Sequence, residues 1–143
     1  MANKNIASMN LFIVLFILLA SFAAMITTAY AREPYTIISM DEVAQRLNKP
    51  KVHILDVNVL ELWEKHHLPG AVHVDSPDLT RFLPIDKTAL IIFYCAGPMC
   101  SMAPAAAREA AMLGYRNIYV MEDGIQGWVM AGKPVEGAKT GKP

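Results

Sequence analysis

Residues 91–101 read IIFYCAGPMCS, an apolar run that ends in a cysteine and continues into a loop with glycine and proline. The alanine-rich residues 102–113 follow and favour a helix, apart from Pro104. This order predicts a strand, a loop and a helix, with the Cys95 thiol where the strand stops. The backbone N–H groups of such a loop, together with the positive end of the helix, can hold an anion, so Cys95 is a candidate nucleophile. The same pattern also fits a buried core cysteine that only ends a strand.

Apolar runs alternate with helical periodicities on both sides of this stretch. Strands are expected at residues 35–38, 52–57, 71–74, 89–94 and 116–120, and helices at residues 40–47, 60–66, 102–113 and 124–132. A further helical turn is expected with Pro77 at its first position. The alternation predicts an α/β fold, a small parallel sheet with helices on both faces. Because parallel strands end at one edge, Cys95 and Asp56 are expected to meet there, which favours a catalytic Cys95.

Residues 1–31 carry the marks of an export segment. Lys4 precedes the apolar residues 11–26, and an Ala-Tyr-Ala sequence ends at Ala31. These features predict a signal peptide cleaved after Ala31. The apolar run is also nearly long enough for an uncleaved membrane anchor, which stays open as the alternative. We therefore expect an exported domain, in the bacterial periplasm or at the outer face of the inner membrane, with membrane contact only through this segment if it is retained.

Charge and cysteine content limit the possible function. The 143 residues carry no formal net charge, and removal of residues 1–31 leaves a domain with one more acid than base. A near-neutral domain lacks the basic footprint of a nucleic-acid-binding protein, so no nucleic-acid partner is expected. The two cysteines, Cys95 and Cys100, are too few for a disulfide scaffold, but in an exported chain they can pair with each other.

Four pieces of the sequence resemble the rhodanese domain family. Leu55-Asp56-Val57 and HLPGA at residues 67–71 are similar to the first rhodanese signature, and Tyr94-Cys95 with Ser101 resembles the active-site loop. Residues 114–119 and 124–135 resemble the closing signature. The resemblance covers residues 35–136 and implies one domain with a five-stranded parallel sheet. Residues 137–143 are then expected to form a flexible tail.

The resemblance implies that Cys95 takes a sulfane sulfur as a persulfide and passes it to a thiol, such as that of an acceptor protein, or to cyanide. Thiosulfate, polysulfide or a protein persulfide would be the donor. A persulfide is an anion, and the loop would hold it without a cofactor. The residues expected to form this anion-binding loop are Ala96, Gly97, Met99, Cys100 and Ser101. No metal is expected, although Met99 and Met102 beside the thiols could bind Cu(I) instead of only packing.

The sequence departs from the family pattern at the loop and after the second strand. Cys100 stands at the end of the loop, where many members have a polar residue or arginine, so no guanidinium is present to fix a dianion such as thiosulfate. Pro98 supplies no N–H donor. Asn58 stands where the family has arginine, so Asp56 is expected to be structural. His67 matches a signature histidine and is expected to form structural hydrogen bonds, while Trp63 and Trp128 are expected to pack.

Cys100 leaves two functions open. As a resolving thiol it would attack a Cys95 persulfide, release sulfide and close a Cys95–Cys100 disulfide. Otherwise it is a small side chain packed under the loop. The favoured function is therefore a sulfurtransferase or sulfur carrier working through Cys95. The alternative is a non-enzymatic binding or redox-sensing module that uses the Cys95–Cys100 disulfide.

Overall fold

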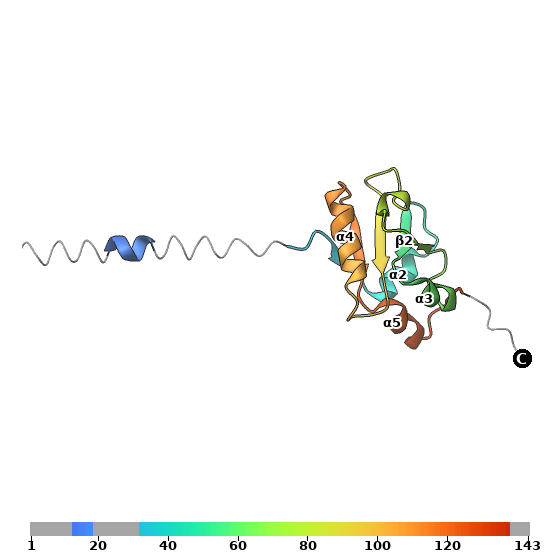
Figure 1. The fold of residues 1–143 in the computed structure, drawn as a ribbon. Coiled ribbons are helices and arrows are strands. Elements are labelled where there is room, and N and C mark those ends of the chain that lie inside the picture. The colour runs from blue at the N-terminus through green and yellow to red at the C-terminus, as the bar shows by residue number, and fades with distance from the viewer. Residues whose placement is uncertain (1–12, 19–31, 138–143) are drawn as a thin grey trace, which may run out of the picture. The chain divides into compact units, whose positions relative to one another are not determined.

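The structure, a computed structural model, describes residues 13–18 and 32–137 and divides into two units, Met1–Arg32 and Glu33–Pro143 (Figure 1). In the first unit, residues 13–18 are helical. The rest of the expected export segment, including Ala31, lies outside the described residues, as do residues 138–143 of the expected tail. Within the described ranges, no helix is both long and apolar enough to span a membrane.

The second unit is built on one parallel five-stranded sheet in the order β1-β5-β4-β2-β3. Its strands are β1 (Thr36–Ile37), β2 (Val52–Asp56), β3 (Val72–His73), β4 (Leu90–Tyr94) and β5 (Ile118–Met121). Its helices are α2 (Met40–Arg46), α3 (Leu60–Lys65), α4 (Met102–Met112) and α5 (Gly124–Met130), with a 3-10 helix η1 (Leu79–Arg81). This confirms the expected α/β fold.

Side chains that alternate along the central strands build a separate core on each face of the sheet. On one face, Ile91 and Phe93 of β4 pack with three buried alanines of α4, Ala103, Ala107 and Ala110. On the other face, Ile92 and Tyr94 pack with residues of α2 and α5, among them Val43, Ile125 and Trp128. Figure 1 shows α4 alongside the sheet and α5 at the end where β4 finishes. Helices therefore cover both faces, as the sequence predicts.

Local signals fix most of the helix ends. Ser39 caps α2 and forms the complete capping box with Glu42. Gly114, with φ +95°, follows the last turn of α4. The prediction for Pro77 is wrong, because η1 begins at Leu79 and is capped by Asp78, whose carboxylate accepts from the Thr80 N–H at 3.1 Å. The Asp78 cap places the turn two residues later than a helix begun by proline would be.

Candidate active site

Cys95 and Cys100 lie at the two ends of the loop between β4 and α4, and the structure joins them in a disulfide. Their Cα atoms are 6.4 Å apart, within the range that a disulfide can bridge. Cys95 is only 3 % exposed, whereas Cys100 is half-buried. Of the other predicted loop residues, Gly97 is buried, Ala96 is half-buried, and Met99 and Ser101 are exposed. The structure therefore brings the predicted loop together around the two sulfur atoms.

The start of α5 holds this loop in place. The N–H groups of Ile125 and Gln126 donate to the carbonyl oxygens of Cys95 and Ala96, at 2.9 and 3.0 Å. Gly124 adopts φ +61°, and a Cβ there would lie 2.5 Å from backbone atoms of the loop. Sequence reasoning missed this support. The available signal was Gly124, which opens the second part of the closing signature, since a glycine permits both a positive φ and a close backbone approach.

The loop keeps several N–H donors open. The Cys100 N–H donates to the Gly97 carbonyl at 2.9 Å, and Pro98 has no N–H. Within the part of the chain that the structure describes, the N–H groups of Gly97 and Met99 donate no hydrogen bond. Ser101 gives α4 no side-chain cap, so the first N–H groups of that helix are also open. Ala103 and Pro104 of that helix line a cavity together with both cysteines, so a negative charge on a loop sulfur would lie near the positive end of an eleven-residue helix.

Two small spaces flank the disulfide. An inner cavity of about 30 Å³ is lined by both cysteines and by residues of β5, with Glu122 beside it. It has room for about one water molecule. An outer hollow of about 270 Å³ is lined by Ala96, Gly97, Pro98, Met99, Cys100 and Gln126. The outer hollow therefore presents Cys100, and none of the described residues that line either space is a lysine or arginine.

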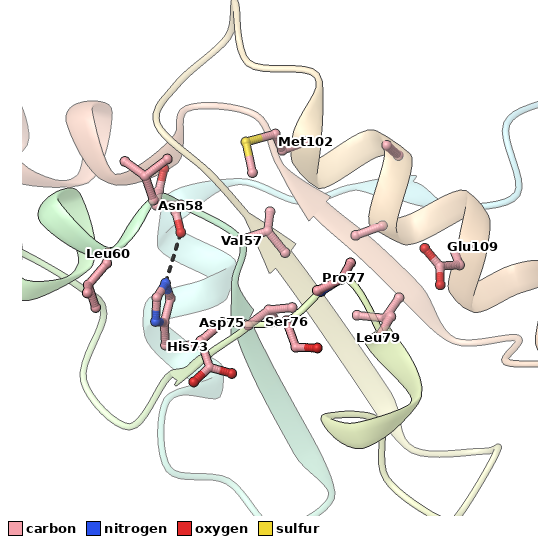
Figure 2. Close-up of a pocket in the computed structure, with 14 residues that line it drawn as sticks. Val57, Asn58, Leu60, His73, Asp75, Ser76, Pro77, Leu79, Met102 and Glu109 are labelled. Carbon is pink, nitrogen blue, oxygen red and sulfur yellow. Dashed lines mark hydrogen bonds between the residues drawn. The ribbon is translucent and has the colours of Figure 1, made fainter.

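A larger groove, of about 680 Å³, adjoins the loop at Met102 (Figure 2). Its walls are the segments after β2 and β3, η1 and the side of α4, so it lies at the carboxyl ends of two strands. Its titratable lining side chains are His73, Asp75 and Glu109. Sequence reasoning did not find this groove, because its walls come from segments far apart in the chain. Its volume is typical of a small-molecule site.

Asp56 lies at the same strand edge but is completely buried, so it serves the fold, as expected. Its Oδ1 accepts from the Asn58 N–H at 2.7 Å. Burial raises the pKa of the Asp56 carboxyl above its usual value, and the neighbouring Tyr94 hydroxyl and Asn58 offset this only in part. The Tyr94 hydroxyl accepts from the Leu68 N–H at 3.0 Å, and burial raises the pKa of this hydroxyl as well. A small cluster of polar groups inside the core is thus formed by Asp56, Asn58, Tyr94 and the Leu68 N–H.

Asp56→Asn is expected to change the pH dependence of stability. A raised pKa means that the folded state holds its proton more tightly than the unfolded state. The carboxyl therefore stabilises the fold at low pH and loses this contribution as the pH rises through its folded pKa. The asparagine does not titrate. The free energy of unfolding of the Asp56→Asn protein minus that of the wild type, measured in urea titrations, should therefore rise from pH 4 to pH 7. A relative stability that falls over this range would contradict the sign.

Tyr94→Phe is expected to lower the free energy of unfolding by about 1–3 kcal/mol, because the buried Leu68 N–H loses its acceptor. Tyr119→Phe is the matched control. Tyr119 is half-buried in β5, and among the described residues its hydroxyl makes no hydrogen bond. Urea unfolding of both variants measures the difference, and an equal loss in the two would show that the Leu68 contact does not stabilise the fold.

The aromatic and histidine side chains support the domain. The His67 ring stacks on Trp63 with centroids 3.6 Å apart, and its Nδ1 lies 2.8 Å from the Trp63 carbonyl oxygen. His67 also exchanges two backbone hydrogen bonds with Glu136, both at 2.8 Å. Trp128 is buried and donates from Nε1 to the Pro134 carbonyl. Across residues 13–18 and 32–137, no group of three His, Cys, Asp or Glu side chains is placed to hold a metal ion.

Comparison with known proteins agrees with the fold. The chain is similar to an HTH-type transcriptional regulator of Mycobacterium tuberculosis, with 34 % identity over 76 % of this chain and 48 % of that one. It is 30 % identical to arsenate reductase 2.1 of rice, Oryza sativa, over 65 % of this chain and 66 % of that one. It is 26 % identical to the thiosulfate sulfurtransferase GlpE of Tolumonas auensis, over 66 % of this chain and 88 % of that one. The chain thus spans about half the length of the regulator.

The solved structure of the polysulfide-sulfur transferase homodimer of Wolinella succinogenes has the same fold, with a TM-score of 0.64 at 18 % identity over 87 % of this chain and 93 % of that one. Residues 39–131 match the description of the rhodanese-like domain. That match takes in α2 to α5, and with them the cysteine loop and its support. The chain belongs to the rhodanese-like domain family.

Proposed function

We propose that this domain carries sulfane sulfur as a persulfide on Cys95. The observation that carries the proposal is the position of Cys95, at the end of β4 and across a short loop from the uncapped N-terminus of α4. Gly97, whose N–H donates no hydrogen bond among the described residues, lines the inner cavity together with Cys95. The similar GlpE proteins are named thiosulfate sulfurtransferases, which supports sulfur transfer as the reaction class.

The transfer needs the reduced form of the loop. The Cys95 thiolate attacks a sulfane sulfur of the donor, a Cys95–sulfur bond forms, and the shortened donor leaves with the electron pair of the broken S–S bond. A thiol or cyanide then attacks the outer sulfur of the persulfide and takes it, and Cys95 leaves as the thiolate. Because no lysine or arginine among the described residues lines either space beside the disulfide, we propose polysulfide or a protein persulfide, and not thiosulfate, as the preferred donor.

Cys100 adds a second outcome for the bound sulfur. Its thiolate attacks the Cys95 sulfur, the Cys95–Cys100 disulfide closes, and the outer sulfur leaves as hydrosulfide. This step would give the same Cys95–Cys100 disulfide that the structure contains. The same disulfide also favours a second candidate function, a non-enzymatic module that binds a partner or senses redox state without carrying sulfur. Both functions place the chemistry on the same pair of cysteines.

Residues 1–31 add a proposal about location. We propose that they direct the domain out of the cytoplasm, to the periplasm or to the outer face of the inner membrane. An oxidising compartment is one in which the Cys95–Cys100 disulfide persists. N-terminal sequencing of the chain from its producing cell tests the cleavage, since a chain that starts at Arg32 would show a removed leader. A chain that starts at residue 1 and stays in the cytoplasm would contradict export.

The sulfur-carrier proposal is tested by the formation of thiocyanate from cyanide. The full chain, first reduced and kept in mild detergent, is given polysulfide or thiosulfate, and the uncatalysed rate is subtracted. The assay is made on Cys100→Ser, in which the disulfide cannot close, and we expect catalysis that disappears when the Cys95→Ser substitution is added, with a higher kcat/KM for polysulfide than for thiosulfate. Activity that persists in Cys95→Ser would contradict the assigned nucleophile, and no activity with either donor would favour the non-enzymatic module.

A further inference from the structure

The two sulfur atoms of the disulfide differ in their access to solvent. Cys95 is 3 % exposed, and of the spaces described above it lines the inner cavity of about 30 Å³. Cys100 is half-buried and also lines the outer hollow of about 270 Å³. An incoming thiol is much larger than the water molecule that the inner cavity can hold. In the oxidised state, a thiol therefore has room to approach Cys100 and no comparable room beside Cys95.

Access to solvent, and not the leaving group, separates the two sulfur atoms. If Cys100 is attacked, Cys95 leaves as a thiolate into the inner cavity, which the first turn of α4 also lines. If Cys95 is attacked, Cys100 leaves beside the start of the same helix, so the positive helix end can stabilise either thiolate. In thiol–disulfide exchange, the rate depends on access to the attacked sulfur as well as on the departing thiolate, and access here favours attack on Cys100.

We propose that the outer hollow is the site at which a dithiol reductant opens the disulfide, by attack on the Cys100 sulfur. A reductant–Cys100 bond forms, the Cys95–Cys100 bond breaks, and Cys95 leaves with its electron pair. The second thiol of the reductant then displaces Cys100, so the reductant becomes a disulfide and two electrons remain on the two cysteines. This step regenerates the Cys95 thiolate, the nucleophile of the proposed function. The reduction step depends on the proposed function only because that function is what uses Cys95 afterwards.

The lining of the hollow indicates which thiols fit. Its side chains carry no charge, and Met99 at its rim is 99 % exposed. Such a hollow suits a reductant whose thiol is flanked by uncharged groups. A carboxylate placed at the rim would repel the attacking thiolate, whereas the same change far from the hollow would not. Met112, also exposed but in the last turn of α4, offers the matched distant position.

The site of attack is tested by trapping the first product of reduction. The oxidised full chain in mild detergent is treated briefly with 2-mercaptoethanol, quenched with acidic N-ethylmaleimide and digested with trypsin. Both cysteines then lie in the peptide of residues 88–108, and its fragment masses distinguish them. At the shortest times we expect 2-mercaptoethanol on Cys100 and maleimide on Cys95, in about tenfold excess over the reverse product. An equal mixture or the reverse assignment would overturn the proposal.

A second measurement tests the hollow itself. Met99→Glu is expected to slow reduction by 2-mercaptoethanol roughly threefold or more at low ionic strength, and added salt should lessen the effect. Met112→Glu should leave the rate unchanged. Equal rates in the two variants would overturn the hollow as the route of attack. Neither measurement uses a sulfur donor, so a failure here is distinct from a failure of the persulfide reaction, which starts from reduced protein.

Discussion

Cys100→Ser is expected to convert a short-lived persulfide on Cys95 into a long-lived one. In the wild-type chain, the Cys100 thiol lies within disulfide reach of Cys95 and can displace the outer sulfur as hydrosulfide. A serine hydroxyl cannot perform this exchange, because it is a much poorer nucleophile than a thiolate. After a single loading with polysulfide, we expect the release of sulfide to fall by at least about tenfold while Cys95 keeps its added sulfur.

The matched control for this prediction is Ser101→Ala, at the exposed neighbouring position of the loop. Sulfide release is measured in the absence of any added thiol, so that Cys100 is the only acceptor. Ser101→Ala should release sulfide as the wild type does. If Cys100→Ser releases sulfide at the wild-type rate, Cys100 is not a resolving thiol.

Gly124→Ala is expected to destabilise the domain and displace the cysteine loop. A Cβ at this position would lie 2.5 Å from the Cys95 carbonyl oxygen, the Ala96 carbonyl carbon and the Gly97 nitrogen. These are backbone atoms, so relief requires the loop to move away from α5. The positive φ of Gly124 adds a strain of about 1–2 kcal/mol for any residue with a Cβ. Because the steric clash adds to the backbone strain, we expect a total loss of about 3 kcal/mol or more in the free energy of unfolding.

Gly132→Ala separates the two contributions. Gly132 has a similar φ of +68°, but a Cβ there would meet nothing within 4 Å. It should therefore lose only the backbone strain, about 1–2 kcal/mol. Urea unfolding gives the stabilities, and alkylation of the reduced protein reports the exposure of Cys95. Faster alkylation is expected only in Gly124→Ala. Equal stability losses and equal alkylation rates in both variants would show that Gly124 does not hold the loop.

The strands and helices could be predicted because their signals are local. The apolar run before Cys95 is long enough to fix the central strand, and the Ser39–Glu42 capping box and Gly114 mark helix ends by residue type alone. The position of Cys95 at the carboxyl edge then follows from the parallel sheet. The start of η1 was predicted two residues too early, because the Asp78 side chain competes with Pro77 as the organiser of the turn.

The surroundings of the cysteines could not be predicted in the same way. The support from Gly124 joins segments about thirty residues apart, and it depends on how closely α5 approaches the loop. The different access of Cys95 and Cys100 depends on where the loop turns, which no spacing in the sequence gives. The groove beside Met102 needs the segments after β2 and β3 to meet α4. These features depend on tertiary structure, and in the proposed reduction of the disulfide they decide which sulfur atom the thiol attacks first.

The central claim, that Cys95 carries sulfane sulfur, is tested most directly by the intact mass of the protein. The full chain and its Cys95→Ser and Cys100→Ser variants are reduced, freed of reductant, exposed briefly to polysulfide and measured in mild detergent. We expect a gain of one sulfur atom in Cys100→Ser and none in Cys95→Ser. In the wild type we expect a brief gain of one sulfur atom, followed by the loss of hydrogen sulfide as the disulfide closes, which leaves the protein two hydrogens lighter than its reduced form. No gain of sulfur in Cys100→Ser would contradict the account.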